Sequence, residues 1–183
     1  MNPFNISDFV SNMTKDGARP NLFEISFTHL GDTFSLRAES TSIPGSSIGV
    51  ATAYFFGREA KFAGNRRFDN WTVNVLLDEA DYKSGGPRYA LESWMNSLNS
   101  HVGNVRDTNF VDPVNYMKDA TVYHWSKDGT EKIATYEMRG CFPVDISPIN
   151  LAWDANDQIA RFSTTFAMQW WQRLGPTDQG NLG

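Results

Sequence analysis

Hydrophobic and polar residues alternate with a period of two along several stretches of the chain, which is the pattern of half-buried β-strands. The longest of these stretches covers residues 159–171. One face of it carries Ala160, Phe162, Thr164, Phe166, Met168 and Trp170, and the other carries Arg161, Ser163, Thr165 and Gln169. We expect one continuous strand here, with its first face on a core.

Shorter alternating stretches form two candidate β-hairpins. Residues 23–28 and 33–39 both alternate, and Gly31-Asp32 between them predicts a turn. Residues 120–139 hold two strand-like runs on either side of Asp128-Gly129, a dipeptide typical of tight turns because Gly adopts positive φ. Both pairs are therefore predicted to be antiparallel.

A helical period replaces the strand pattern between residues 87 and 100. Leu91, Trp94, Met95 and Leu98 follow the spacing i, i+3, i+4 and i+7, so they form one apolar packing face. Pro87 suits the first turn of this helix, where its missing N–H costs nothing. Just before the helix, residues 71–77 are rich in β-branched side chains and predict a further strand.

The remaining segments are less regular. Residues 7–13 predict a short helical turn and residues 102–118 a long loop. We expect a single domain over residues 1–172, of which 1–17 form an N-terminal arm, and a flexible tail over 173–183. Strands outnumber helices, so the expected fold is mainly β, an antiparallel β-sandwich or partly closed barrel with one flanking α-helix.

Residues 48–68 fit this fold poorly as part of an isolated molecule. They predict an extended hairpin that turns near Gly57, and its first arm, residues 50–56, is uncharged and ends in three aromatic residues. The candidate assembly residues are Val50, Ala51, Ala53, Tyr54, Phe55, Phe56, Gly57, Arg58, Glu59, Lys61, Phe62, Arg66 and Arg67. Either the hairpin is a central element of the chain's own core, or a neighbouring copy covers it and pairs its edge. Composition does not choose between these interpretations.

Size and charge narrow the classes of function. The 183 residues suit one domain, and 40% hydrophobic with 14% aromatic residues supply a real core. The net charge of −5 argues against tight binding to nucleic acid. Cys141 has no partner in the chain, the first residues lack a signal-peptide pattern, and no apolar run approaches the length of a membrane span. We expect a soluble protein that folds in a reducing cytoplasm and does not contact membrane.

Candidate chemistry is sparse, and we expect no enzyme activity, no catalytic or metal site and no cofactor. His29, His101 and His124 lie in different predicted elements without the spacing of metal ligands. Asp78, Glu79 and Asp81 form an acidic cluster, for which a solvated strand end is a better interpretation than a cation site.

Two groups of residues suggest binding functions that we rank lower. Arg58, Lys61, Arg66 and Arg67, with Phe62 and Phe68, resemble a nucleic-acid patch with interleaved aromatics. Glu59 and Asp69 dilute that patch, so ion pairs between subunits are the better interpretation. Six Trp residues are compatible with a carbohydrate-binding sandwich, but Trp71, Trp94 and Trp170 occupy predicted core positions.

Three blocks of sequence resemble the tail tube proteins of contractile-tailed bacteriophages. They cover residues 18–24, 57–73 and 151–159, the last running into the long final strand. The block over 57–73, which reads GREAKFAGNRRFDNWTV, is the most specific of the three. The chain departs from the family pattern in its longer 2–17 arm, around 81–86 and after Trp171.

The resemblance implies a structural virion protein. The sandwich would be orthogonally packed, and the extended hairpin would join neighbours in a hexameric ring. Rings would stack into the inner tail tube, the conduit for DNA ejection inside the contractile sheath. The implied partners are further copies of the chain, sheath subunits, the baseplate, the tail terminator and DNA in transient passage. The protein would be made in the host bacterial cytoplasm and reside in the virion tail. An inner-tube protein of a related injection machine, such as type VI secretion or a tailocin, is the alternative.

Overall fold

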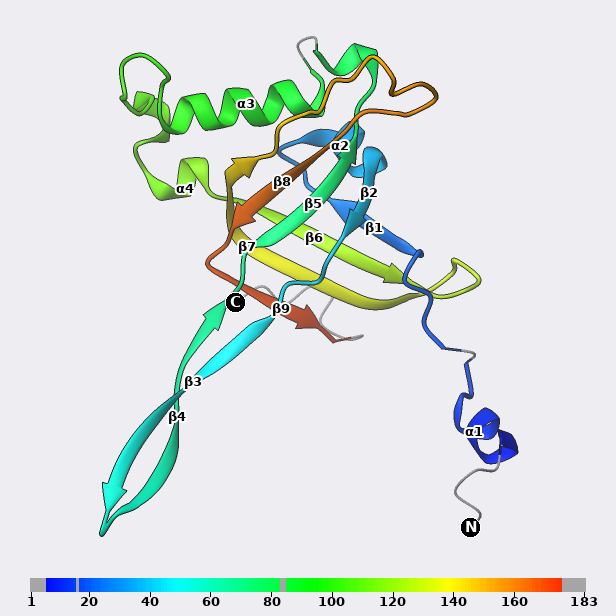
Figure 1. Cartoon of the computed structure of the whole chain (residues 1–183), viewed down its shortest axis with the longest axis vertical. Helices are drawn as coiled ribbons and strands as arrows, with labels where there is room; N and C mark the ends of the chain where they lie inside the picture. The colour runs from blue at the N-terminus through cyan, green and yellow to red at the C-terminus, as the bar shows by residue number, and fades with distance from the viewer. Residues whose placement is uncertain (1–5, 16, 83–84, 176–183) are drawn as a thin grey trace.

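The computed structural model describes residues 6–15, 17–82 and 85–175 (Figure 1). Its strands are β1 (Phe23–Ser26), β2 (Ala38–Thr41), β3 (Ser46–Phe55), β4 (Arg58–Phe68), β5 (Trp71–Leu76), β6 (Lys118–Trp125), β7 (Lys132–Ile146), β8 (Arg161–Ala167) and β9 (Trp170–Leu174). The α-helices are α1 (Ile6–Asn12), α2 (Gly31–Arg37), α3 (Pro87–Leu98) and α4 (Pro113–Tyr116). Short 3₁₀ turns occupy Glu79–Tyr82 and Thr108–Phe110. The chain is therefore mainly β, as predicted.

One antiparallel sheet forms the body, with the strand order β1-β6-β7-β8-β5-β2 and with β9 also paired to β7. The long strand β7 belongs to both halves of this sheet: its residues 135–139 pair with β9, and its residues 142–146 pair with β8. Gly140, with φ of 65°, bends β7 between the two halves. Strands that bend in this way turn the corner of a sandwich. The sheet thus folds over its own core without closing into a barrel.

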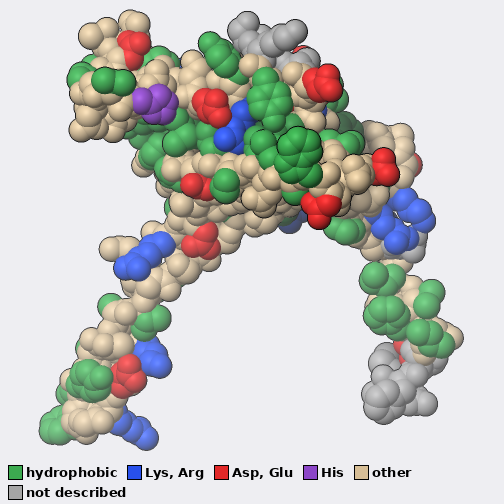
Figure 2. Space-filling model, turned by 45° about the horizontal axis from the view of Figure 1, so that its top comes forward, with side chains coloured by type: hydrophobic (Ala, Val, Ile, Leu, Met, Phe, Trp, Pro, Cys, Tyr) green, Lys and Arg blue, Asp and Glu red, His purple; other side chains and the backbone are tan. Residues whose placement is uncertain are grey.

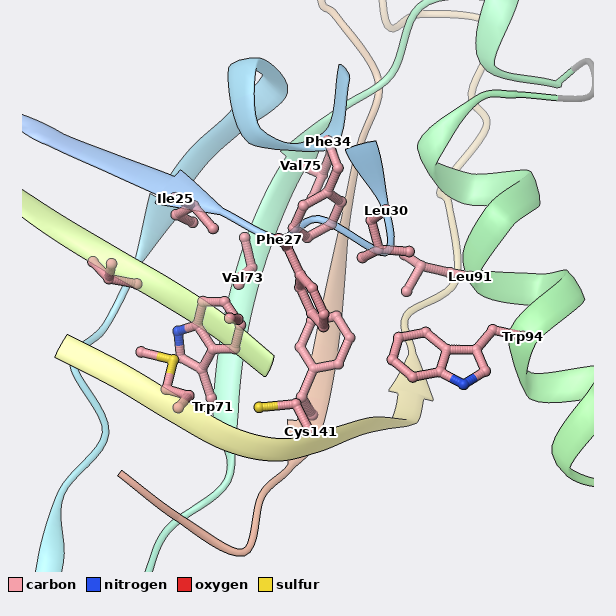
Figure 3. Packing of buried hydrophobic residues seen from close by; sticks show 14 of the residues in the cluster. Ile25, Phe27, Leu30, Phe34, Trp71, Val73, Val75, Leu91, Trp94 and Cys141 are labelled. Atoms are coloured by element: carbon pink, nitrogen blue, oxygen red, sulfur yellow. The ribbon is translucent and has the colours of Figure 1, made fainter. Parts of the chain in front are cut away.

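The core between the two halves is dominated by aromatic side chains (Figure 3). Phe27 lies at its centre, with ring centroids 5.2 Å from Phe166, 5.9 Å from Trp94 and 6.2 Å from Trp71. Helix α3 flanks the sheet and buries Leu91 and Trp94, with Leu98 packed beside them and Met95 half-buried. The body therefore holds a contiguous core of its own.

Residues 33–39 do not form the predicted hairpin with residues 23–28: residues 31–37 form helix α2, and only Ala38 and Glu39 belong to a strand, β2. β1 pairs with β6 and β2 with β5. Leu30 and Phe34 are both buried, whereas Leu36, predicted to share a face with Phe34, is 85% exposed. A spacing of four residues places Leu30 and Phe34 on one side of a helix, where Phe34 packs on Phe27. The prediction failed because a short stretch can satisfy both periods, and contact with Phe27 decided between them.

The predicted continuous strand over 159–171 is also interrupted. β8 ends at Ala167 and β9 begins at Trp170, opposite the bend of β7 at Gly140. A Cβ at position 140 would lie 2.7 Å from Cγ of Gln169, so the two chains bend together at close contact. Across the interruption the alternation changes face: Trp171 packs against Tyr136, and Trp170, predicted to face the core, is 40% exposed.

The other predicted elements match the structure. β6 and β7 form the hairpin with its turn at Asp128-Gly129, and β5, α3 and the short helix α1 are present. The loop predicted over 102–118 contains α4 and one 3₁₀ turn. Of the predicted tail, Arg173 and Leu174 belong to β9, and residues 176–183 lie outside the described part of the chain.

Candidate assembly surface

β3 and β4 form a two-stranded ribbon that projects away from the body (Figure 1). Within the described residues the two strands pair with each other and with no other strand. This is the hairpin predicted over residues 48–68, and the structure places it outside the chain's own core. A two-stranded ribbon alone in water is marginally stable, because nothing covers its faces.

The tip of the ribbon is a two-residue turn at Phe56 and Gly57, with φ of 47° and 79°. Two consecutive positive φ values give the type I′ geometry, whose twist matches that of the flanking strands. Phe56 is 93% exposed, and its ring lies edge-on to Phe55 with 4.6 Å between centroids. The most exposed end of the ribbon is thus aromatic.

The register gives the ribbon two different faces. Ala51 pairs with Phe62, Ala53 with Ala60 and Phe55 with Arg58, so these six side chains share one face. We call it the apolar face, after Ala51, Ala53, Phe55, Ala60 and Phe62. The opposite, mixed face carries Val50, Thr52, Tyr54, Glu59, Lys61 and Ala63. The large hydrophobic side chains on both faces are exposed, from 59% for Phe62 to 76% for Tyr54.

A bulge interrupts the ribbon where Gly49 faces residues 64 and 65. Here the two backbones approach closely: a Cβ on Gly64 would lie 2.9 Å from the carbonyl oxygen of Gly49. A Cβ on Gly49 would meet only ordinary contacts, 3.5 Å from the Asn65 carbonyl oxygen. Bulges bend a strand and increase its twist, so Gly64 helps to set the curve of the ribbon.

The base of the ribbon is tied to the body. The Asp69 amide donates to the carbonyl of Gly45 at 3.2 Å, and Trp171 Nε1 donates to the same carbonyl at 3.4 Å. The Trp171 ring also contacts Phe68, with 6.4 Å between centroids. A Cβ on Gly45 would lie 2.8 Å from Asp69 Oδ2, so the carboxylate of Asp69 would have to shift to admit a side chain there. β9 therefore fixes the direction in which the ribbon leaves the body.

The ribbon and the rest of the chain carry net charges of opposite sign. Residues 46–68 hold four cationic side chains and one carboxylate, a net charge of +3, whereas the whole chain carries −5. The remaining residues thus carry −8. Lys61 Nζ lies 3.9 Å from Glu59 Oε2, and this exposed pair contributes little to stability. A basic ribbon beside an acidic body suits contact between copies in head-to-tail order.

The acidic cluster holds a partner that the sequence prediction missed. Arg37 donates to Asp81, and its Nη2 lies 3.0 Å from Asp78 Oδ2. Asp81 is 1% exposed and also accepts from the Asp78 amide at 2.7 Å, so the predicted solvated strand end is wrong for this residue. In a strand over residues 33–39, Arg37 would lie on the face opposite Phe34, whereas helix α2 directs it at the cluster.

The other singled-out side chains are dispersed. His29 lies against Trp94, with 4.5 Å between ring centroids, and partial burial followed by the charge of Lys118 lowers its pKa. Burial, with the nearby Asp119 carboxylate, raises the pKa of the Cys141 thiol to about 12. Trp71 and Trp94 are buried, so no sugar could stack on them. Residues 6–15, 17–82 and 85–175 contain no group of three potential metal-ligating side chains and no helix long and apolar enough to span a membrane.

Comparison with known proteins gives a consistent result. The sequence model of a family described as phage tail tube protein matches residues 3–174. The chain is 31% identical to tail tube protein gp19 of Enterobacteria phage T4 over 169 residues, covering 90% of this chain and 99% of that protein. It is 24% identical to the tail tube protein of Serratia phage KSP90 over 129 residues, 70% of this chain and 68% of that protein.

Solved structures share the fold. The sheath-tube complex of an extracellular contractile injection system, named PVC, contains a chain that matches with a TM-score of 0.64 at 20% identity, covering 90% of this chain and 96% of that one. The sheath/tube terminator of the same system matches with a TM-score of 0.65 at 20% identity, covering 87% and 97%.

Proposed function

The chain belongs to the phage tail tube protein family and is a structural protein of the inner tail tube of a contractile-tailed phage, and we propose that its β3–β4 ribbon is the device that closes copies into a ring. The single observation that carries this proposal is the exposure of the whole ribbon, aromatic tip included, beside a body whose own aromatic core is complete.

Ring closure follows from head-to-tail contact. The ribbon of one copy lies along its neighbour, which covers the apolar face and pairs an open strand edge. The next copy does the same, and six repeats, the number expected for this family, return to the first. The ribbon's cations meet the acidic body of the neighbour, which both orients the contact and neutralises them.

The mixed face then looks into the channel. Between the bulge and the tip it offers Thr52, Tyr54 and the Glu59–Lys61 pair, so this part of the face presents balanced charge. Such a lining lets DNA pass without holding it, because tight phosphate binding needs an excess of cations. We assign the outer surface to the sheath and the ends of the tube to the baseplate and the terminator. The chain acts by assembly and not by catalysis, and it is made in the bacterial cytoplasm before joining the tail.

Electron microscopy of the concentrated purified protein tests the ring. We expect hollow rings, alone or stacked, and a single sedimenting species of monomer mass at the same concentration would contradict the proposal. Immunogold labelling of virions with contracted sheaths tests the location, since the bared tube should bind antibody along its length. The related fold in an injection system makes a tailocin or secretion tube the second candidate. Tails that lack a DNA-filled capsid would favour it.

A further inference from the structure

The N-terminal helix α1 and the residue that follows it carry an apolar stripe that the described part of the subunit leaves exposed. Ile6, Phe9 and Val10 of α1 and Met13, just after the helix, follow the spacing i, i+3, i+4 and i+7, and they are between 48% and 70% exposed. Figure 2 shows hydrophobic side chains gathered on this arm, apart from the body. This spacing is the one with which a short amphipathic helix lies in an apolar groove.

A groove of suitable chemistry lies on the body. It has a volume of about 570 Å³, and its apolar wall is formed by Leu76, Leu77, Tyr82, Ile159 and Ala160. Its polar side is formed by Arg37, Asp78, Glu79 and Gln158. Ile159 is 63% exposed and Tyr82 60%, so its walls are apolar and open to solvent. Arg37 is already paired with Asp78 and Asp81, so the guanidinium at the groove does not need a charged guest. We call this the end groove.

The helix and the groove lie at opposite ends of the molecule. In Figure 1 α1 hangs below the body, while the 3₁₀ turn of Glu79–Tyr82 and the loop before β8 lie at the top. Ten residues, 13–22, join α1 to β1. A fully extended chain of that length spans at most about 35 Å, which limits how far α1 can reach from β1. Complementary surfaces at opposite ends of one subunit join copies in an open filament, because the contact does not close on itself.

We propose that α1 of each copy docks its apolar stripe into the end groove of a second copy in the adjacent ring, and so links rings along the tube. This inference rests on the proposed ring and adds the axial contact that the ribbon does not supply. One contact covers both apolar surfaces, whereas a foreign partner on α1 would leave the end groove open.

Substitution of Phe9→Asp, with Ser11→Asp as control, separates stacking from ring closure. Both variants add one negative charge to an exposed helix, but position 11 faces away from the stripe. We expect Phe9→Asp to leave rings intact by electron microscopy while the protein concentration needed for tubes rises at least about tenfold, as for loss of an anchor side chain. Ile159→Asp should act in the same way from the groove side, and Ser11→Asp should assemble like the unaltered protein.

Two outcomes would overturn the inference, and a third would contradict the proposed function on which it rests. Tubes that form normally from Phe9→Asp would show that α1 does not link rings, while the ring proposal would stand. Loss of the rings themselves would show that α1 makes a lateral contact. Absence of rings in the unaltered protein would instead contradict the proposed function.

Disulfide cross-linking between introduced cysteines gives a second test, in which docking produces a new covalent product. Phe9→Cys combined with Ile159→Cys should form a disulfide between chains under mild oxidation of assembled tubes, giving a ladder of multiples on non-reducing gels. Cys141 is buried and its raised pKa of about 12 keeps it in the unreactive thiol form. Ser11→Cys with Ile159→Cys is the control and should give little ladder. A fast-migrating monomer, cross-linked within one chain, would show that α1 folds onto its own body and would refute docking between copies.

Discussion

The body and the ribbon use the same kinds of residue in the same antiparallel pairing, yet their aromatic side chains have opposite fates. Phe27, Phe166 and Trp71 are at most 1% exposed, whereas Tyr54, Phe55 and Phe62 are at least 59% exposed. The body has a second layer to pack against, because β7 bends and brings two halves of the sheet together. The ribbon has none. The difference teaches that the core is completed in the body, and it is the basis of our proposal that assembly uses the ribbon.

The largest contrast should come from truncating one aromatic ring in each region. Phe166→Ala removes a ring from the centre of the core, and cavities of this kind cost about 3–5 kcal/mol of unfolding free energy. Phe62→Ala removes the same ring from the ribbon, where the isolated subunit loses little buried area, so its unfolding midpoint should barely change. Urea unfolding of the monomer measures both. Equal destabilisation would show that the ribbon is part of the folding unit.

A charge on the apolar face should act on assembly alone. Ala53→Asp places a carboxylate where the neighbour covers the ribbon, and a buried unpaired charge costs several kcal/mol, enough to weaken association at least about hundredfold. The monomer should keep its unfolding midpoint, because Ala53 is exposed in it. Thr52→Asp, on the mixed face, is the matched control and should still form rings. Sedimentation velocity distinguishes the two variants. Normal rings from Ala53→Asp would show that the interface does not include the apolar face.

The bulge allows a finer test of how the shape of the ribbon contributes to assembly. Gly64→Ala brings a Cβ to 2.9 Å from a backbone oxygen, so the two strands must part, at a cost of about 1–3 kcal/mol. Gly49→Ala meets only van der Waals contacts and serves as control. Light scattering should show tubes forming from Gly64→Ala only at higher concentration than from Gly49→Ala. Identical thresholds would mean that the curve of the ribbon is not used in assembly.

The smallest effect concerns pH and belongs to the body. The pKa of His29 is lowered in the folded state. As the pH falls, His29 is therefore protonated at a higher pH in the unfolded chain than in the folded one. The contribution of neutral His29 to the free energy of unfolding is therefore fully present above the unfolded pKa of about 6.5, and it is lost as the pH falls below that value. Thermal unfolding of the monomer between about pH 5 and about pH 7.5 should show a slightly steeper slope for the unaltered protein than for His29→Asn. Ribbon exposure should not depend on this titration.

The sequence predicted most elements because local patterns and final contacts agreed in them. The turn at Asp128-Gly129, the stripe of α3 and the alternation within β5 and β8 each point one face at the core that the structure contains. The prediction failed where two local interpretations were equally good. Leu30 and Phe34 suit a helix as well as a strand, and packing against Phe27 chose the helix.

For the candidate site, the sequence identified the segment, its turn near Gly57 and its concentration of aromatic and cationic residues. It left open whether the chain's own core covers them. No local pattern could answer that question, since burial depends on what lies beyond the strand and not on the strand itself. The structure shows the ribbon outside the body and divides it into an apolar and a mixed face by register.

The sequence by itself determined the mainly β class, the flanking helix and an apolar hairpin with too much hydrophobic surface, because period, turn residues and composition are local properties of a chain. Only the tertiary structure decided where β7 bends, which tryptophan faces the core, that Arg37 meets Asp78 and Asp81, and that the ribbon and α1 stand free of the body. These depend on contacts between residues far apart in sequence, and such contacts are fixed only when the whole core packs at once.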